Sequence, residues 1–166
     1  MLQRGEYDIP TGEPLQPGTL KVMGTFPDNA PCNRLGLAQW LVAPEHPLVA
    51  RVLVNRIWQR IFGEGLVRTP EDFGLQGEQP THPQLLDWLA VELHDCGWNL
   101  KQMLRSFVLS RTFRQSSAFR SDVNDPDNRL LARGPRHRLD AEVIHDVALW
   151  SSGLLERHMG GEGIKP

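Results

Sequence analysis

The sequence of 166 residues contains only two cysteines, one tyrosine and three lysines, and it has no long apolar run. Cys32 and Cys96 form no C-x-x-C or C-x-x-C-H pattern, so this stretch encodes neither a structural zinc site nor a covalently attached haem c. The sequence leaves a disulfide between them open. No segment approaches the roughly 20 apolar residues needed to cross a bilayer. The start, Met1 to Glu6, lacks the apolar stretch of a signal peptide.

Alternation of apolar and polar residues with a period of two is also absent over any useful length, which argues against a sheet. With 40% hydrophobic and 23% charged residues, the composition is typical of one globular domain that folds without a metal or a disulfide. The sequence therefore predicts an all-α fold: an irregular bundle of four to five main helices, with an extended N-terminal arm and one long ordered loop. The G-x-S-x-G, H-E-x-x-H and Gly-rich phosphate-loop signatures are missing.

Two regions divide the chain. Residues 1–32 are rich in proline and glycine, and we predict an extended arm or linker from a missing upstream domain, with at most one short strand. Residues 33–166 are predicted to form the helical domain. Its tail after Met159 is loop-like and closes no element, so we expect this domain to be truncated at its C-terminus.

Start and stop signals predict five main helices. Asn33 is a good N-cap, and Gly63 can take the left-handed conformation that ends a helix. Thr81 and Gln84 form a capping-box pattern, whereas Asn99 and Asp140 are further caps. The predicted helices span residues 34–41, 48–62, 81–96, 99–108 and 140–154.

Apolar residues recur at helical spacing within these segments. Residues 114–139 are polar and broken, although Asp125-Pro126 to Arg133-Gly134 carries the start and stop signals of a further short helix. The positions predicted to be buried are Ala50, Leu53, Val54, Ile57, Trp58, Ile61, Phe62, Leu85, Leu86, Leu89, Ala90, Leu93, Met103, Leu104, Phe107, Val108, Ala141, Ile144, Val147, Ala148 and Ser151.

The longest irregular stretch is residues 63–80. Loops of this length are uncommon in compact domains and are usually either functional or disordered. Leu66, Val67, Phe73 and Leu75 give this one apolar side chains to pack. We therefore predict an ordered loop with one short helical turn.

Charge is distributed in blocks of alternating sign around a formal net charge of −2. Residues 34–60 carry +3, residues 62–99 carry −6 and residues 101–140 carry +5. This pattern predicts pairing between segments of the fold rather than a basic groove for nucleic acid. The densest basic run, from Arg129 to Arg138, lacks the aromatic residues that a single-strand platform needs.

The polar face of the helix over residues 48–62 is one candidate site. It contains Arg51, Asn55, Arg56 and Gln59, with Trp58 alongside. These residues could bind an anion or a sugar. The favoured alternative is partial burial against the acidic loop, where Arg56 or Arg51 meets Glu71 or Asp72 and a buried ion pair locks the loop in register.

Two further groupings invite a chemical hypothesis. Glu142-x-x-His145-Asp146 has half the spacing of a di-iron carboxylate site, but no second half exists, so we predict no metal and expect these acids to be solvated or paired with arginines. His82 and Asp87 flank the junction between the loop and the next helix. His82 could serve as a general base, but packing or capping in the first turn of the helix is the better explanation.

Seven phrases follow one another along the chain: Asn33-Arg-Leu-x-Leu-Ala-x-Trp-Leu41, Asn55-Arg-Ile-Trp-Gln59, Phe62-Gly-x-Gly-Leu-Val67, Asp72-Phe-Gly-x-Gln-Gly-Glu78, Thr81-His-Pro-x-Leu-Leu-Asp-Trp-Leu89, Gly97-Trp98 and Ser110-x-x-Phe-Arg-Gln-Ser-Ser117. Arg-Gly-x-Tyr and Pro-Gly within residues 4–18 precede them, and Gly-Gly near residue 160 follows. Together they resemble the planctomycete-type, cytochrome-associated domain of unknown function found in large exported proteins.

The resemblance implies a periplasmic or otherwise exported protein, in which a c-type cytochrome-like domain and a sister domain precede this one in the same polypeptide. Haem c would belong to that separate domain, so no cofactor is expected in this chain. The resemblance also implies continuation beyond Pro166, and it transfers no catalytic residue. The family has arginine where this chain has His137 and His145, which further weakens the metal hypothesis.

The positions matching the family motifs are Asn55, Arg56, Trp58, Asp72, His82, Asp87, Trp88, Arg114, Arg138, Glu142 and Asp146. All of them except Trp88 form a candidate functional or structural polar cluster.

The sequence favours an interaction or scaffolding module over catalysis. The alternative is an extracellular enzyme domain, acting for example on polysaccharide, with its site between the loop at 63–80 and the helix at 48–62. An electron relay would use the five tryptophans, but these are better explained as core residues.

Overall fold

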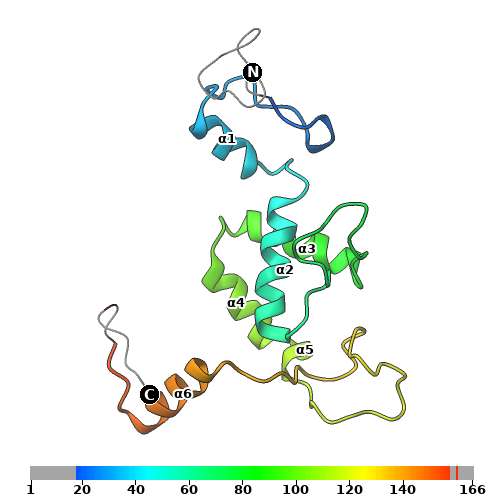
Figure 1. Ribbon diagram of the computed structural model, residues 1–166, viewed down its shortest axis with the longest axis vertical. Coiled ribbons are helices and arrows are strands. Elements are labelled where there is room, and N and C mark those ends of the chain that lie inside the picture. Colours follow the sequence, from blue (N-terminus) through cyan, green and yellow to red (C-terminus); the bar gives the residue numbers. More distant parts are fainter. Residues whose placement is uncertain (1–17, 158–159, 161–166) are drawn as a thin grey trace, which may run out of the picture. The chain divides into compact units, whose positions relative to one another are not determined.

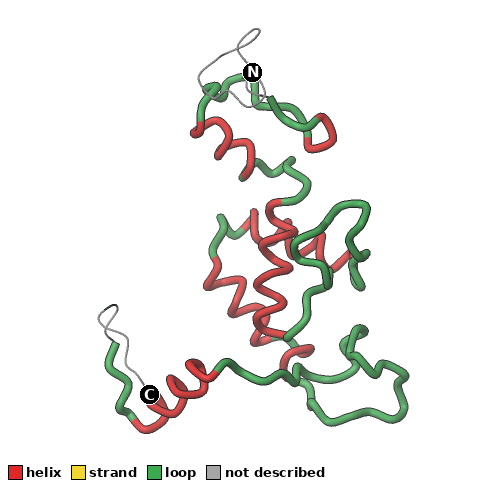
Figure 2. Tube along the Cα trace, viewed as in Figure 1, coloured by secondary structure: helices red, strands yellow, loops and turns green. Residues whose placement is uncertain are grey.

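The structure, a computed structural model, describes residues 18–157 and 160 of the chain. Helices are the only regular elements among these residues, which confirms the predicted all-α fold (Figure 2). The chain divides into two units, Met1–Pro135 and Arg136–Pro166. The first half of the predicted arm, residues 1–17, and the predicted tail at 161–166 lie outside the described residues.

Three helices build the core of the first unit (Figure 1). α2 (Val49–Phe62) packs against α3 (Pro83–Asp95) and α4 (Leu100–Leu109). The Trp58 ring stacks on Phe62 with centroids 3.9 Å apart and meets Phe107 of α4 edge-on at 5.4 Å. The buried hydrophobic residues are Ala50, Val54, Trp58, Leu66, Val67, Leu86, Leu89, Ala90, Leu93, Met103 and Phe107.

The helix ends follow several of the predicted signals. Asn33 Oδ1 accepts from the backbone of α1 (Arg34–Leu41), and Asn99 Oδ1 accepts from Gln102 N at 3.1 Å. Gly63 and Gly97 follow α2 and α3 with φ values of 91° and 63°. These left-handed values suit glycine, so the stop signals in the sequence were correct.

The N-terminal part of the described chain forms short helices rather than a strand. η1 (Lys21–Met23) is a single 3-10 turn, and α1 follows it. A Cβ atom on Gly36 of α1 would lie 2.0 Å from the Pro31 carbonyl oxygen and 2.9 Å from the Phe26 ring. The short helix therefore lies against the preceding segment only because residue 36 has no side chain.

Residues 125–134 correct one prediction, because they form turns instead of a helix. The buried Asp125 carboxylate accepts from Arg129 N at 2.7 Å and from Leu130 N at 2.9 Å. Asn128 and Leu131 have φ values of 54° and 60°. Left-handed residues at these positions are incompatible with a helix, so the aspartate organises a loop instead of capping one.

Two more predictions fail at α4 and just after it. Leu104 and Val108, predicted to be buried, are 42% and 40% exposed. The next element, α5 (Arg111–Arg114), lies in part of the chain where no helix was predicted. The hydroxyl of Ser110 caps α5 by accepting from Phe113 N at 3.1 Å.

The second unit contains α6 (Ala141–Ser152), which ends at Gly153 with a φ of 76°. Asp140 is the N-cap residue as predicted, but its side chain makes no capping hydrogen bond. No residue of α6 is buried. The predicted packed side is wrong for the described structure, because this unit contains no second described helix to cover it. Its exposed members are Ala141, Ile144, Val147, Ala148 and Ser151.

Candidate functional site

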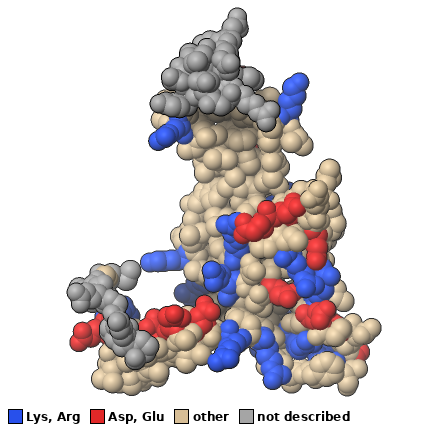
Figure 3. Space-filling view, viewed as in Figure 1, with Lys and Arg blue, Asp and Glu red and all other residues tan. Residues whose placement is uncertain are grey.

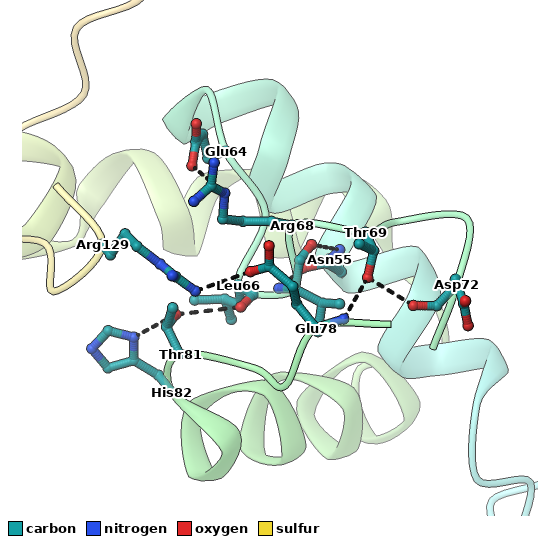
Figure 4. Close-up of polar contacts among 11 residues, drawn as sticks. Asn55, Glu64, Leu66, Arg68, Thr69, Asp72, Glu78, Thr81, His82 and Arg129 are labelled. Carbon is teal, nitrogen blue, oxygen red and sulfur yellow. Dashed lines mark hydrogen bonds and ion pairs between the residues drawn. The ribbon is translucent and has the colours of Figure 1, made fainter. Parts of the chain in front are cut away.

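One buried amide holds the loop of residues 63–80 against α2 (Figure 4). Asn55 is fully buried, at 0% exposure. Its Oδ1 accepts from the Val67 N–H and its Nδ2 donates to the Val67 carbonyl, both at 2.9 Å. The carboxamide therefore satisfies both polar groups of a backbone residue that is itself only 2% exposed. The polar face of α2 was predicted to be partly buried against this loop, and Asn55 is the residue of that face that the structure buries there.

Gly65 makes this contact sterically feasible. A Cβ atom at this position would lie 2.5 Å from the Val67 carbonyl oxygen and 2.8 Å from both amide atoms of Asn55. Real Cβ atoms essentially never approach this closely. The Gly-x-Gly-Leu-Val phrase therefore encodes the close passage of the loop over Asn55.

The outer part of the loop is closed by the hydroxyl of Thr69. It donates to the Asp72 carbonyl at 2.8 Å and accepts from Glu78 N at 3.0 Å (Figure 4). The Asp72 carboxylate accepts from Gly74 N at 2.7 Å. The loop is thus organised by side chains bonded to its own backbone, and the predicted helical turn is absent from it.

The junction of the loop with α3 also differs from its predicted form. Thr81 was expected to cap α3, but its hydroxyl lies 3.3 Å from the Leu66 carbonyl, which also accepts from Thr81 N at 2.9 Å. His82 is instead the N-cap residue, with no side-chain cap, and its Nδ1 lies 3.0 Å from the Thr81 hydroxyl. The hydrogen bonds from Thr81 to the Leu66 carbonyl replace the capping box and hold the C-terminal end of the loop.

Ion pairs join the oppositely charged blocks of the sequence, which confirms the predicted pairing. On the face of the first unit drawn in Figure 3, acidic and basic side chains lie next to one another rather than in fields of one sign. The pairs between blocks are Arg51–Asp87 at 2.7 Å, Arg56–Glu71 at 3.0 Å and Arg129–Glu78 at 3.1 Å.

The predicted ion pair between α2 and the loop exists, but the prediction that it is buried is wrong. Arg56 does meet Glu71, but their side chains are 53% and 84% exposed. The Asp72 carboxylate bonds to Gly74 N, and Arg51 pairs with Asp87 on α3. Exposed pairs contribute only about 0–1 kcal/mol each. The buried contact that fixes the loop is therefore the uncharged pair of Asn55 and Val67.

The other candidate residues lie in different environments. Trp58 is a core residue, and Trp88 is 56% exposed on α3. Arg114 is an exposed residue at the end of α5. Three candidates belong to the second unit and are exposed there: Arg138, Glu142 and Asp146. The structure thus gathers Asn55, Arg56 and Asp72 around the loop.

His46 is a structured polar residue that the sequence analysis missed. It is only 8% exposed, and its Nδ1 accepts from Leu48 N and Val49 N, each at 3.3 Å, at the start of α2. The Trp40 ring meets the imidazole edge-on at 4.6 Å between centroids. Burial lowers the pKa of His46 from 6.5. A histidine shortly before a predicted helix start is the signal that could have revealed this cap.

Within residues 18–157, no group of three or more His, Cys, Asp or Glu side chains is arranged to hold a metal ion. Both cysteines are free thiols: Cys32 is exposed, and Cys96 is partly buried with its sulfur 3.4 Å from the Leu93 carbonyl. None of the described helices combines the length and apolar character needed to traverse a membrane.

Residues 33–166 match one family model, described as PSD1, protein of unknown function (DUF1553). No curated protein and no solved structure significantly matches the chain.

Proposed function

Because the chain belongs to the family of proteins of unknown function DUF1553, whose description names no activity, we propose from its own residues that it is an interaction or scaffolding module. A hydrolytic site would present two free carboxylates to solvent about 5–10 Å apart. A structural loop would instead bind its acids internally. The two alternatives therefore differ in what the acidic residues of the loop contact.

The observation that supports the proposal is that each acidic side chain of the loop at 63–80 has an intramolecular partner. Glu71 and Glu78 pair with Arg56 and Arg129. Asp72 bonds to a backbone N–H within its own turn, and Glu64 pairs with Arg68 at 3.3 Å. These carboxylates are engaged within the chain, so the loop is better suited to presenting a surface than to acid–base catalysis.

We further propose that the module acts within an exported protein, next to a c-type cytochrome-like domain and a sister domain of the same polypeptide. The support for this is the resemblance of the seven sequence phrases. Haem c would be bound by the cytochrome-like domain alone. The module would then hold or orient its neighbours rather than carry electrons itself.

The test begins with the coding sequence on both sides of this segment. The proposal expects an upstream signal peptide and an in-frame C-x-x-C-H. The encoded cytochrome-like domain, produced separately, is then titrated with the 166-residue chain and followed by sedimentation at the haem absorbance. Co-sedimentation supports the scaffolding proposal, whereas its absence at high concentration contradicts it.

The enzyme alternative is tested on the same preparation. A panel of extracellular polysaccharides is incubated with the wild-type chain and with Glu71→Gln and Glu78→Gln variants. The scaffolding proposal expects no reducing ends from any of them. Turnover that both variants abolish without loss of folding would establish the enzyme alternative.

A further inference from the structure

His46 lies between the N-terminal segment, defined here as residues 18–45, and the helices of the core. Its ring meets Trp40, in the last turn of α1, edge-on at 4.6 Å between centroids. Its Nδ1 accepts from Leu48 N and Val49 N, where α2 begins. One imidazole therefore contacts the end of α1 and the start of α2 at the same time.

The other contacts of the N-terminal segment stay within it. In the described structure, no hydrogen bond, ion pair or aromatic pair joins residues 18–45 directly to residues 47–157. The hydrophobic core is built from Ala50 and later residues. The backbone N–H of His46 donates to the Ala43 carbonyl at 3.0 Å, so this residue bonds to the chain on both of its sides. His46 is thus the junction of the segment with the core.

The bonds that His46 makes to α2 require a neutral ring. Backbone N–H groups donate both of them, so Nδ1 must offer a lone pair and the single ring proton must lie on Nε2. A second proton would occupy Nδ1 and remove both bonds. It would also place a positive charge at the N-terminal end of α2, where the helix dipole is already positive. Leu48, the N-cap residue of α2, has no side-chain cap that could replace the lost acceptor.

The charged groups around His46 offer a protonated ring no partner. α1 contains one charged residue, Arg34, at its far end. In the first turn of α2, Arg51 pairs with Asp87 at 2.7 Å, so that carboxylate is already engaged. Glu45 is exposed and forms no ion pair in the described structure. Burial is accordingly the cause that lowers the pKa of His46.

We propose that His46 is an acid-sensitive switch at this junction. The neutral ring fastens the end of α1 to the start of α2, and protonation releases the N-terminal segment while the helices of the core stay folded. Among the described histidines, His46 is the one that the structure buries, at 8% exposure. The inference goes beyond the proposed function, because it concerns the response of the chain itself to pH.

The size of the response follows from the linkage between protonation and release. In the released segment the ring of His46 has its ordinary pKa of 6.5, whereas the pKa of the fastened ring is lower. Below pH 6.5, the ratio of released to fastened molecules should therefore rise by up to about tenfold for each pH unit, until the fastened ring also takes up a proton.

The experiment is an NMR titration of the 166-residue chain from about pH 8 to about pH 5. We expect the ring signals of His46 and the amide signals of Leu48 and Val49 to change with one shared midpoint. The nuclear Overhauser contact between the rings of His46 and Trp40 should weaken over the same range. The amide of Leu93 in the core should keep its chemical shift, which separates local release from global unfolding.

Two variants test whether His46 is responsible. His46→Asn keeps an acceptor at the start of α2 but cannot titrate, so the amides of Leu48 and Val49 should no longer respond to pH. His94 and Trp98 are the matched control, because their rings also meet edge-on, at 4.7 Å, but His94 lies in the last turn of α3 rather than before a helix start. His94→Gln should leave the response of the wild type unchanged.

Three results would overturn the inference. The first is a wild-type chain in which Leu48 and Val49 do not respond when His46 titrates, or in which His46 does not titrate. The second is a response that persists in His46→Asn. The third is loss of the Leu93 signal at the same midpoint, since the whole chain would then unfold together. None of these results depends on whether the chain binds a cytochrome-like domain, so the switch and the scaffolding function can fail separately.

Discussion

Removing the amide of Asn55 should be among the most destabilising single changes in this chain. In Asn55→Ala, the N–H and the carbonyl of Val67 both lose their partner while the residue remains buried at 2% exposure. Each buried polar group left without a hydrogen bond costs about 1–3 kcal/mol. The expected loss is therefore about 2–6 kcal/mol, a large part of the roughly 5–15 kcal/mol that stabilises a typical domain.

The assay is urea unfolding followed by the fluorescence of the five tryptophans, of which Trp58 lies in the core next to Asn55. Arg60→Lys, an exposed and conservative change on the same helix, is the control and should stay within about 0.5 kcal/mol of the wild type. A loss below about 1 kcal/mol for Asn55→Ala would refute the reasoning, since Val67 would then have found other partners at little cost.

Asn55→Asp tests the same contact by replacing the Nδ2 donor that bonds to the Val67 carbonyl with an oxygen. Ionised aspartate can still accept from Val67 N but places negative charge against the Val67 carbonyl, whereas the protonated acid can donate to that oxygen. Burial should raise the pKa of the introduced acid in the folded state. The variant should therefore be strongly destabilised at neutral pH and recover stability as the pH falls, which is opposite to the effect of acid on most domains.

Three further predictions follow from the same structure. Gly65→Ala should destabilise the chain by more than about 1 kcal/mol in the same urea assay, because its Cβ has no room beside Asn55. Arg56→Ala should cost less than about 1 kcal/mol, since its partner Glu71 is largely exposed, and a larger loss would indicate a buried role. Burial holds the pKa of His46 in the folded state below its unfolded value of 6.5. The stability that its neutral ring contributes is therefore fully present above pH 6.5 and is lost as the pH falls below 6.5. The difference in unfolding free energy between wild type and His46→Asn, which keeps an acceptor at the cap, should therefore change in favour of the variant from about pH 8 to about pH 5, and a constant difference would contradict the assignment.

Local signals predicted the elements of the first unit well. Asn33 and Asn99 cap helices in the structure as their positions indicated, and Gly63 and Gly97 follow helices with positive φ values. Helix caps and helix ends depend on residues within one turn of each other, so the local sequence is enough to predict them. The charge blocks were informative for a similar reason, because opposite charges pair wherever the chain brings them close.

The sequence could not identify the uncharged hydrogen-bond partners of individual side chains. Asn55 was predicted to lie on a polar face partly buried against the loop, but its backbone partner Val67 could not be identified because the path of the loop was unknown. Thr81 has the sequence pattern of a capping box, yet its hydroxyl bonds to the carbonyl of Leu66. Asp125 has the same local chemistry as a helix cap, and the left-handed residues after it turn the chain into a loop. Asn55 and Thr81 thus bond to residues of a distant segment, whereas Asp125 bonds to nearby N–H groups in a loop and not in a helix.

The loop that Asn55 holds has a practical consequence for redesign. Hydrogen bonds hold both ends of the loop. Asn55 bonds to Val67 near its start, and Thr81, which follows it, bonds to the Leu66 carbonyl. Leu75, at the tip of the loop, is fully exposed. A lengthened tip breaks the turn in which Gly77 N donates to the Gly74 carbonyl but leaves both of these contacts in place. Each doubling of loop length adds only about 0.6 kcal/mol to the entropic cost of closing the loop. A foreign peptide grafted at Leu75 should thus be displayed on a rigid base, which makes this position a natural attachment point for a reporter or an epitope.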